Sequence, residues 1–227
     1  MRWLHHSHAR PGRSAGLAIA LLILAACSSG QSTNWSEVFT AAFHSIRSDR
    51  PGITLEQAAS VPYASVGVRV DGGNEILLAL AGKTGTEALW TSASRIVLLT
   101  RNGRIVRTAG IEHNLTEARI VEGSRGAPPT DVSASSRWEL DFADLNLYSV
   151  QVRCTSVVRG PETVKNFTVN IPTIHVDETC RSDQLDWSFV NSYWISPTTG
   201  LTWRTIQYVN PKMGPIEVEI LRPATAS

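Results

Sequence analysis

The sequence predicts a mainly β protein: an antiparallel meander sheet, closed as a sandwich or curled as a half-barrel, with an N-terminal helix. From Tyr63 almost to the end, short runs alternate between apolar and polar residues, as half-buried strands do. Turn-forming pairs such as Asn102-Gly103 separate these runs. Residues 34–47 instead repeat apolar side chains every three or four positions, which is the period of a helix packed by one face.

The first segment is expected to be a removable export signal. Residues 1–13 carry three arginines and no acid, and the apolar run that starts at Ala15 is too short to span a bilayer. Leu24-Ala25-Ala26-Cys27 resembles the lipobox of bacterial lipoproteins, whose cysteine receives diacylglycerol. We therefore predict cleavage of residues 1–26, lipidation of Cys27 and anchoring to a membrane; a plain secretory signal with a chance cysteine is the alternative. The residue after Cys27 is Ser28 and not aspartate, and in this respect the chain resembles lipoproteins that are sorted to the outer membrane.

The length and charge of the remaining chain limit its domain count and its classes of partner. Removal of residues 1–26 leaves 201 of the 227 residues, enough for one domain with a full-sized core. We expect a polar tether over 27–33 and a single mainly β domain over 34–227. The signal removes three of the 21 arginines and lysines, so 18 basic residues stand against 20 acidic ones. This near-neutral balance argues against nucleic-acid binding, and the sequence contains no metal-ligand or cofactor motif.

Helix signals lie before the strands. Asn34, followed three residues later by Glu37, is typical of an N-cap with a capping box. The apolar stripe of this helix consists of Val38, Phe39, Ala42, Phe43 and Ile46. We expect the stripe to pack on the sheet; a membrane-lying or partner-binding helix is the alternative, although the polar face is not basic. Pro51-Gly52 ends this helix, and Thr54 is expected to cap a second short helix over Leu55–Ala59.

The first strands are expected to form hairpins. Tyr63–Val70 and Glu75–Ala81 flank the turn Asp71-Gly72-Gly73, and Leu89–Ser92 is a further short strand. Ile96–Thr100 and Ile105–Ala109 flank Asn102-Gly103, and both residues of that pair tolerate the positive φ of a type I′ turn. A two-residue turn there predicts three cross-strand pairs, namely Arg101 with Arg104, Leu99 with Val106 and Val97 with Thr108.

The later strands follow a loop. Residues 124–136 are mostly glycine, alanine, proline and serine, which predicts a loop but no domain boundary. Trp138, Leu140 and Phe142 then alternate with acids and predict a half-buried strand. The strands expected after it are 148–158, 164–176, the alternating run 185–189, the run 193–195, 201–209 and 216–221.

Two cysteines remain once Cys27 is lipidated. Cys154 and Cys180 form an even pair in an oxidising compartment, and both continue strand-like alternations. We expect a disulfide that staples neighbouring antiparallel strands. Two buried free thiols are the alternative; a catalytic thiol is disfavoured because no histidine has an evident reason to lie beside either cysteine.

Several segments carry a resemblance to a known family. They are Val61-Pro62-Tyr63-Ala64-Ser65, the stretch from Ser94 to Thr108 with Thr100-Arg101-Asn102-Gly103-Arg104 at its centre, Ser192-Tyr193-Trp194, and Gln207-Tyr208. Together they resemble the YjbF/GfcB family of group 4 capsule and exopolysaccharide lipoproteins, over nearly the whole mature chain. The resemblance implies an outer-membrane lipoprotein linked to exopolysaccharide production or export, with no established enzymatic activity. Ile195-Ser196-Pro197, where relatives often carry an acid, and the Cys154/Cys180 pair depart from the family pattern.

The candidate binding residues are basic and aromatic. Arg95, Arg101, Arg104 and Arg107 surround the Asn102-Gly103 turn, where facing like charges repel unless an anion or solvent separates them. An anionic polysaccharide could supply carboxylates for bidentate guanidinium contacts. The alternative is a solvated, charged edge that prevents sheet-to-sheet aggregation. Trp194 is a further candidate, since aromatic rings stack on sugars as well as filling cores.

These observations predict a non-enzymatic outer-membrane lipoprotein, facing the periplasm, that assists exopolysaccharide or capsule production or export. Its expected partners are the membrane, through the lipid anchor, an anionic polysaccharide and other export proteins. A LolB-like carrier of lipids or lipoproteins is the alternative. A carbohydrate-active enzyme is less favoured, because it needs two carboxylates facing each other across a sugar, and Asp177 and Glu178 are neighbours that point to opposite faces of a strand.

Overall fold

A computed structural model of the chain describes residues 52–224. One short α-helix precedes twelve strands that form a single antiparallel sheet. The elements are α2 (Leu55–Ser60), β1 (Ser65–Val70), β2 (Ile76–Thr84), β3 (Glu87–Thr91), β4 (Val97–Arg101), β5 (Arg104–Ala109), β6 (Glu117–Glu122), β7 (Ser135–Phe142), the 3-10 turn η1 (Ala143–Leu145), β8 (Leu147–Asn166), β9 (Val169–Ser182), β10 (Trp187–Ile195), β11 (Thr202–Gln207) and β12 (Ile216–Arg222).

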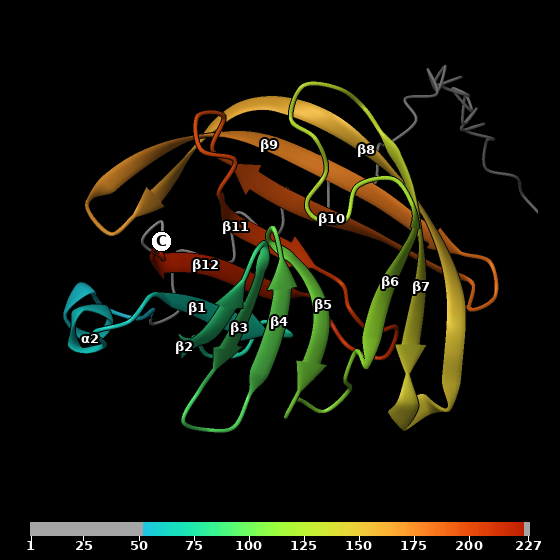
Figure 1. Cartoon of the computed structure of the whole chain (residues 1–227), viewed down its shortest axis with the longest axis horizontal. Coiled ribbons are helices and arrows are strands. Elements are labelled where there is room, and N and C mark those ends of the chain that lie inside the picture. Colours follow the sequence, from blue (N-terminus) through green and yellow to red (C-terminus); the bar gives the residue numbers. More distant parts are fainter. Residues whose placement is uncertain (1–51, 225–227) are drawn as a thin grey trace, which may run out of the picture.

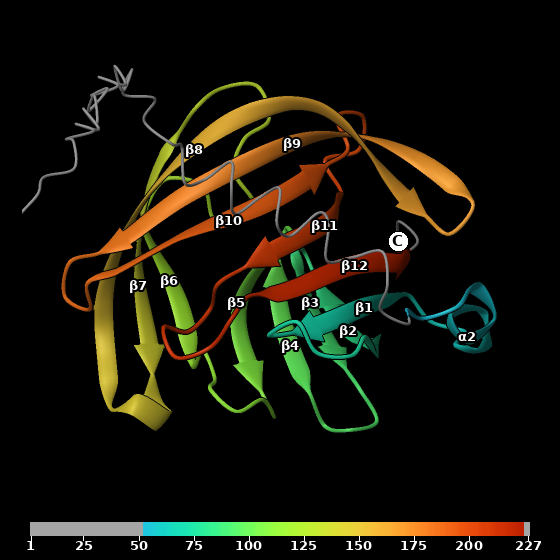
Figure 2. The same ribbon diagram turned by 180° about the vertical axis from the view of Figure 1, so that it is seen from behind.

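The sheet is a meander whose first and last strands meet in its middle. Its order is β5-β4-β3-β2-β1-β12-β11-β10-β9-β8-β7-β6, so β1 pairs with β12 and the seam lies between β5 and β6, which are consecutive in the chain. The sheet curls until it is nearly closed into a barrel (Figure 1), and β9 to β12 are seen as successive neighbours from behind (Figure 2). The predicted antiparallel meander is therefore confirmed, and of its two closures the curled one is observed.

Contacts between β5 and the segment after it bring the two sides of the seam together. The Thr108 amide donates to the Leu115 carbonyl at 2.9 Å. Arg107 also forms an ion pair with Glu117 on β6 and donates to the Thr116 carbonyl. Side chains and a short connection thus take the place of a full strand ladder at the seam.

The curled sheet is pinched where the β4–β5 hairpin meets β11. A Cβ atom at Gly103 would lie 2.5 Å from Thr202, so only glycine fits this approach. Gln207 donates from Nε2 to the Gly103 carbonyl at 2.8 Å, and its Oε1 accepts from the Ile105 amide at 3.0 Å. The hairpin therefore rests against the opposite wall and divides the interior between the β1–β5 side and the β6–β10 side.

The local signals read from the sequence match the structure at α2 and at the hairpin turn. Thr54 caps α2 and forms a capping box with Gln57, and Asn102 and Gly103 have φ values of 46° and 81°. Arg101 pairs with Arg104 as predicted. The helix predicted over 34–47 lies outside the described residues.

The predicted pairing further along this hairpin is wrong. Leu99 pairs with Arg107 and Val97 with Ala109, instead of Val106 and Thr108, because the register shifts by one residue between Leu99 and Thr100. Such a bulge lets consecutive residues of one strand turn inward. Arg104, Ile105 and Val106 are accordingly all buried.

The boundary predicted between the strands 148–158 and 164–176 is wrong, because residues 164–166 belong to β8 and the second predicted strand contains the turn between β8 and β9. β8 runs through Gly160, where the register to β9 shifts, and the chain reverses only after Asn166. Phe167, with φ of 53°, occupies the turn. Pro161 remains inside β8 and pairs with Ile174, so the glycine-proline signal marks an irregularity in a long strand and not its end.

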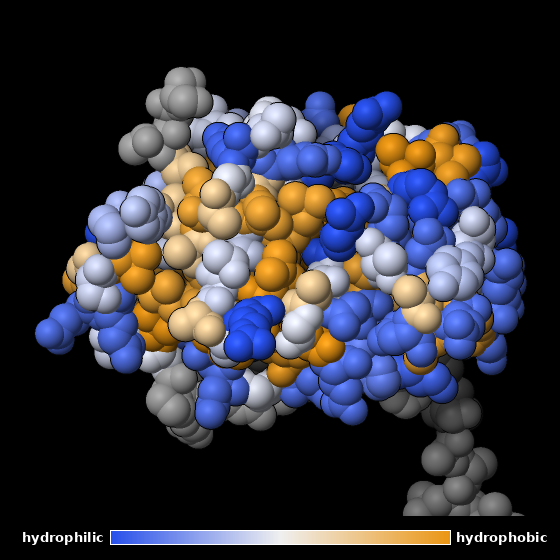
Figure 3. Space-filling view, turned by 60° about the horizontal axis from the view of Figure 1, so that its bottom comes forward, coloured by the Kyte–Doolittle hydropathy of each residue, from blue (hydrophilic) through white to orange (hydrophobic). Residues whose placement is uncertain are grey.

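The core fills the inside of the curl. Inward residues of many strands form one large apolar cluster, which includes Val68, Leu98, Trp138, Phe142 and Ile216. On the face shown in Figure 3, hydrophobic residues gather toward the β1–β5 side, and the β6–β8 side is mostly hydrophilic. Within residues 52–224, none of the helical segments has the length and apolar character needed to cross a membrane.

Candidate functional site

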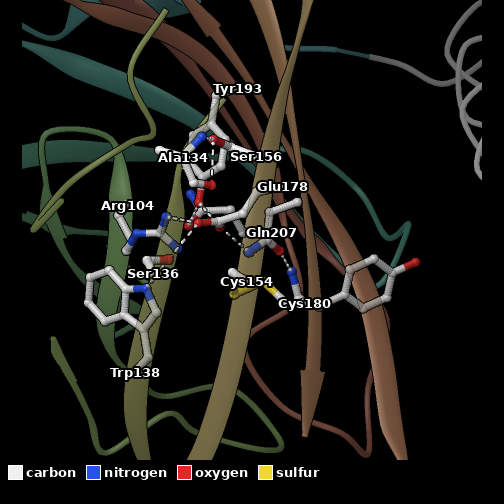
Figure 4. Close-up of a disulfide and its surroundings, with 12 residues drawn as sticks. Arg104, Ala134, Ser136, Trp138, Cys154, Ser156, Glu178, Cys180, Tyr193 and Gln207 are labelled. Carbon is white, nitrogen blue, oxygen red and sulfur yellow. Dashed lines mark hydrogen bonds and ion pairs between the residues drawn. A yellow bond between two sulfur atoms is a disulfide. The ribbon is translucent and has the colours of Figure 1, made fainter. Parts of the chain in front are cut away.

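A buried ion pair joins the hairpin to the far wall of the sheet. Arg104, at the start of β5, donates from Nη2 to Glu178 Oε1 on β9 at 2.7 Å. Their side chains are only 8% and 3% exposed. Figure 4 shows the two side chains pointing toward each other across the interior. A charge pair at this depth is maintained only by close geometry and further hydrogen bonds, because both ions have lost their water.

Neutral donors from two strands complete the surroundings of Glu178. Its Oε2 accepts from Asn191 Nδ2 at 3.3 Å and from the Tyr193 hydroxyl at 3.4 Å, both on β10. Its Oε1 also accepts from the Ser136 hydroxyl on β7 at 3.3 Å. Burial, together with the negative charge of Glu178, raises the pKa of the Tyr193 phenol despite the nearby Arg104. The tyrosine is therefore a neutral hydrogen-bond donor at this site.

Besides Glu178, the guanidinium of Arg104 contacts a backbone carbonyl and two aromatic rings. Its Nε donates to the Gly126 carbonyl at 2.9 Å, which ties the loop between β6 and β7 to the interior. Its carbon lies 4.5 Å from the Trp138 ring centre and 5.4 Å from that of Tyr193. Burial has the largest effect and lowers the pKa of Arg104, but the electrostatic interactions and hydrogen bonds with Glu178 and Tyr193 together outweigh it and the net pKa is raised. The guanidinium therefore stays charged.

The predicted disulfide lies beside this network. Cys154 on β8 and Cys180 on β9 are bonded, and they are directly opposite each other in the antiparallel ladder. Both cysteines are buried and belong to the core cluster. Glu178 is two residues before Cys180 on the same inward face of β9 (Figure 4). The covalent link therefore fixes the two strands at the point where the buried charge is attached.

A cavity occupies the interior on the β1–β5 side of the pinch. Its volume is about 210 Å³. The apolar part of its wall includes Val66, Leu80, Trp90, Leu201, Trp203 and Ile220. The turns β2–β3, β4–β5 and β10–β11 meet around it through Gly85, Asn102 and Gly200. Of the described residues that line the cavity, Lys83 is the one with a charged side chain.

Several polar side chains in the cavity wall form hydrogen bonds with neighbouring residues. Trp90 donates to the Thr100 hydroxyl at 3.0 Å. The Thr202 hydroxyl donates to the Asn102 carbonyl at 3.3 Å, and Thr205 accepts from Gln207 at 3.0 Å. These bonds leave the interior of the cavity with an apolar character.

A second polar cluster lies on the opposite face of β9. His175 stands between two acids, with Nε2 3.0 Å from Asp177 Oδ1 and Nδ1 3.1 Å from Glu162 Oε2. Asp177 also accepts from Ser192 at 2.6 Å and from Arg159 at 2.8 Å. The serine hydroxyl bonds to the aspartate and not to the histidine, so the cluster differs from a Ser-His-Asp relay.

This cluster predicts a pH dependence of stability. Burial raises the pKa of Asp177, but hydrogen bonds from His175, Ser192 and Arg159 outweigh it and lower the pKa from 3.8 to about 2. A lowered native pKa contributes stability above the unfolded value, and the contribution is lost as pH falls from about 4 to about 2. We expect urea unfolding to show a loss of about 2 kcal/mol over this range.

The matched variants for this prediction are Asp177→Asn and Asp131→Asn. Asp177→Asn should be less stable at neutral pH and should lose this part of the acid dependence of stability. Asp131→Asn, at an exposed position, should change neither the stability nor its acid dependence. An unchanged acid slope in Asp177→Asn would contradict the assignment.

The four arginines proposed as an anion site do not converge on one surface. Arg95 is exposed in the β3–β4 turn, at the other end of β4 from the hairpin tip. Arg101 pairs with Glu87, Arg107 pairs with Glu117, and Arg104 is buried on Glu178. Three of the four guanidinium groups are thus already matched by carboxylates of the chain.

Trp194 is buried, with 1% of its surface exposed. It stacks on His175 at 4.5 Å between ring centres, and the Arg204 guanidinium lies 4.6 Å above it. As the sequence indicated, Asp177 and Glu178 point to opposite faces, because their partners lie in two separate clusters. The sequence did not identify Arg104 and Glu178 as a pair, since 74 residues separate them; the signal for Glu178 was an acid on the face of β9 that also carries Val176 and Cys180.

Comparison with known proteins gives consistent matches over most of the chain. Residues 35–221 match the family model described as group 4 capsule polysaccharide lipoprotein gfcB, YjbF. The chain is 26% identical to the uncharacterized lipoprotein GfcB of Escherichia coli (strain K12) over 216 residues, which cover 92% of this chain and 97% of that protein. It is 24% identical to the uncharacterized lipoprotein YjbF of the same organism over 213 residues, with the same coverage of 92% and 97%.

A solved structure shares the fold. The hypothetical lipoprotein YmcC from Escherichia coli (K12) superposes with a TM-score of 0.59 at 21% identity, covering 84% of this chain and 96% of that one. The names of these relatives state no catalytic activity and no lipid or lipoprotein transport. The comparisons thus give no support to the carrier or the carbohydrate-active enzyme considered from the sequence. Because the family model spans residues 35–221, the chain belongs to the YjbF/GfcB family of group 4 capsule polysaccharide lipoproteins.

Proposed function

We propose that this protein is a non-enzymatic lipoprotein of the outer membrane that assists production or export of a capsule or exopolysaccharide. The family match over residues 35–221 carries this proposal. The lipobox-like Leu24-Ala25-Ala26-Cys27 supports it, because acylation of Cys27 would hold the folded part of the chain at a membrane. Ser28 supports the outer membrane as the destination, with the domain over 34–227 facing the periplasm.

The side-chain chemistry agrees with a role other than catalysis. Glu178 is neutralised by Arg104, and Asp177 is bonded to Arg159 and Ser192. Hydrolysis of a glycosidic bond would need two carboxyl groups facing one substrate, whereas these two acids lie on opposite faces of β9. The proposal therefore assigns them to holding the curled sheet in shape.

A complementation experiment tests the proposal. Secreted and cell-retained polysaccharide are measured in a deletion strain that carries wild type, Cys27→Ala or Ser28→Asp, with the level of each protein checked. Wild type should restore secreted polymer. Cys27→Ala should not, because it has no acyl anchor, and Ser28→Asp should not if the outer membrane is the site of action.

Fractionation of the membranes provides the control for each variant. Wild type should separate with the outer membrane, and Cys27→Ala should be released from membranes. Polymer that is unchanged in amount, size and location in the deletion strain would refute the role in production or export. Full restoration by Ser28→Asp retained at the inner membrane would refute the location alone.

A further inference from the structure

We propose that the cavity on the β1–β5 side binds the alkyl chain of an anionic amphiphile, with Lys83 at the headgroup. The proposal concerns a binding site and not transport of lipids between membranes. It is independent of the role in polysaccharide production, because it rests on the walls of the cavity and on one charge.

The size and polarity of the cavity select an apolar chain. An apolar cavity of about 150 Å³ stays dry and binds a benzene molecule, and this one measures about 210 Å³. Its wall includes two indole rings, Trp90 and Trp203. The hydroxyl groups of Thr100 and Thr202 are bonded within the wall. A polar ligand would therefore lose hydrogen bonds to water against the mostly apolar wall.

The charge at the cavity indicates the headgroup. Lys83 is exposed near the end of β2, and it forms no ion pair with the described residues. The nearby charges on β3 and β4 are matched, since Glu87 pairs with Arg101. An unmatched ammonium beside an apolar cavity is complementary to a ligand that carries one negative charge at the end of an alkyl chain.

The route into the cavity has room for a chain. Its surrounding turns contain Gly85 and Gly200, and a Cβ atom added at either glycine would meet no atom within 4 Å. Gly82, next to Lys83 on β2, is equally open. These exposed glycines leave the rim of the cavity free of side chains at their positions, whereas Gly103 lies directly against Thr202.

Tryptophan quenching by a brominated alkyl chain tests the proposal. The probe is 8-bromooctanoate, and 8-bromooctanol is its neutral counterpart. The protein is the whole mature chain, residues 27–227, with Cys27→Ala so that no attached acyl chain competes. We expect saturable quenching by 8-bromooctanoate that is lost in the double variant Trp90→Phe/Trp203→Phe and retained in Trp187→Phe. Equal quenching in Trp90→Phe/Trp203→Phe and in Trp187→Phe would overturn the assignment of the binding site to this cavity.

Variants of the headgroup and of the wall separate the two parts of the proposal. Lys83→Glu should weaken the binding of 8-bromooctanoate about fivefold, since a single exposed charge contributes modestly to affinity. The affinity for 8-bromooctanol should stay unchanged. Lys165→Glu, a charge reversal at an exposed lysine on β8, is the matched control and should change neither affinity. The same affinity for Lys83→Glu and Lys165→Glu would overturn the headgroup assignment.

Ala88→Phe fills the cavity from β3 and should abolish quenching by both probes. Val218→Phe fills it from β12 and serves the same purpose if Ala88→Phe fails to fold, with circular dichroism and thermal melting as the check. Undiminished quenching in a folded, filled variant would show that the chain binds elsewhere and would overturn the proposal.

Discussion

Glu178→Gln is expected to lower the free energy of unfolding by about 3–5 kcal/mol, because it leaves the Arg104 charge buried without its partner. Glutamine keeps the size of the side chain, removes the charge and replaces one accepting oxygen by an NH2 group that only donates. The guanidinium cannot turn to solvent easily, since Gly126, Trp138 and Tyr193 surround it. Urea unfolding at neutral pH measures the loss, and the melting temperature should fall by about 10 °C.

The control for this prediction is Asp183→Asn, in the turn that directly follows β9. Asp183 accepts from Arg181 and Arg153 at a site where its own side chain is 55% exposed. Exposed pairs contribute little to the free energy of unfolding, because water and salt screen them. Losses of similar size in both variants would refute the special role of burial.

A double variant tests whether the charge or the packing is responsible. Arg104→Met/Glu178→Leu replaces the pair by apolar side chains, so no buried charge remains uncompensated. It should be more stable than Glu178→Gln alone. A double variant as unstable as the single one would indicate that the hydrogen bonds of Ser136, Asn191 and Tyr193 matter more than the ion pair.

Removal of the disulfide is the second large effect that we expect. Cys154→Ala/Cys180→Ala should lose about 3 kcal/mol, because the bond closes a loop with a sequence separation of 26 residues and restricts the unfolded chain. The two cysteines belong to the β8–β9 ladder, so that hairpin should lose protection first in hydrogen exchange.

Reduction of the Cys27→Ala chain, in which the Cys154–Cys180 bond is intact, provides the matching measurement. A reductant should lower the unfolding midpoint of the Cys27→Ala chain and should leave that of the double alanine variant unchanged. If the reductant destabilised both proteins equally, the effect would not come from the Cys154–Cys180 bond.

Much of the local structure could be predicted from neighbouring residues. Asn102-Gly103 predicted its turn because both residues take a positive φ, and Thr54 predicted the start of α2 because its hydroxyl accepts from the Gln57 amide. The alternation of Trp138, Leu140 and Phe142 identified the buried face of β7. Each of these features depends on residues close in the chain.

The register of the β4–β5 hairpin shows where such reasoning failed. The turn predicted the Arg101–Arg104 pair correctly, but the bulge at Leu99 and Thr100 shifted the pairs beyond it. Local alternation contains no signal for this bulge. Arg104 is buried because it meets Glu178 on β9, although its place beside a hairpin tip had suggested an exposed cation.

The sequence by itself determined the antiparallel meander, the Asn102-Gly103 turn, the cysteine pair and the lipobox-like start, because these depend on periodicity, on backbone preferences and on residue counts. Only the tertiary structure decided how the sheet curls, that Arg104 meets Glu178 across the interior, that Trp194 is buried, and that a cavity remains beside the pinch. The physical reason is that alternation along a strand assigns each side chain to a face, whereas the curl of the whole sheet decides which faces meet.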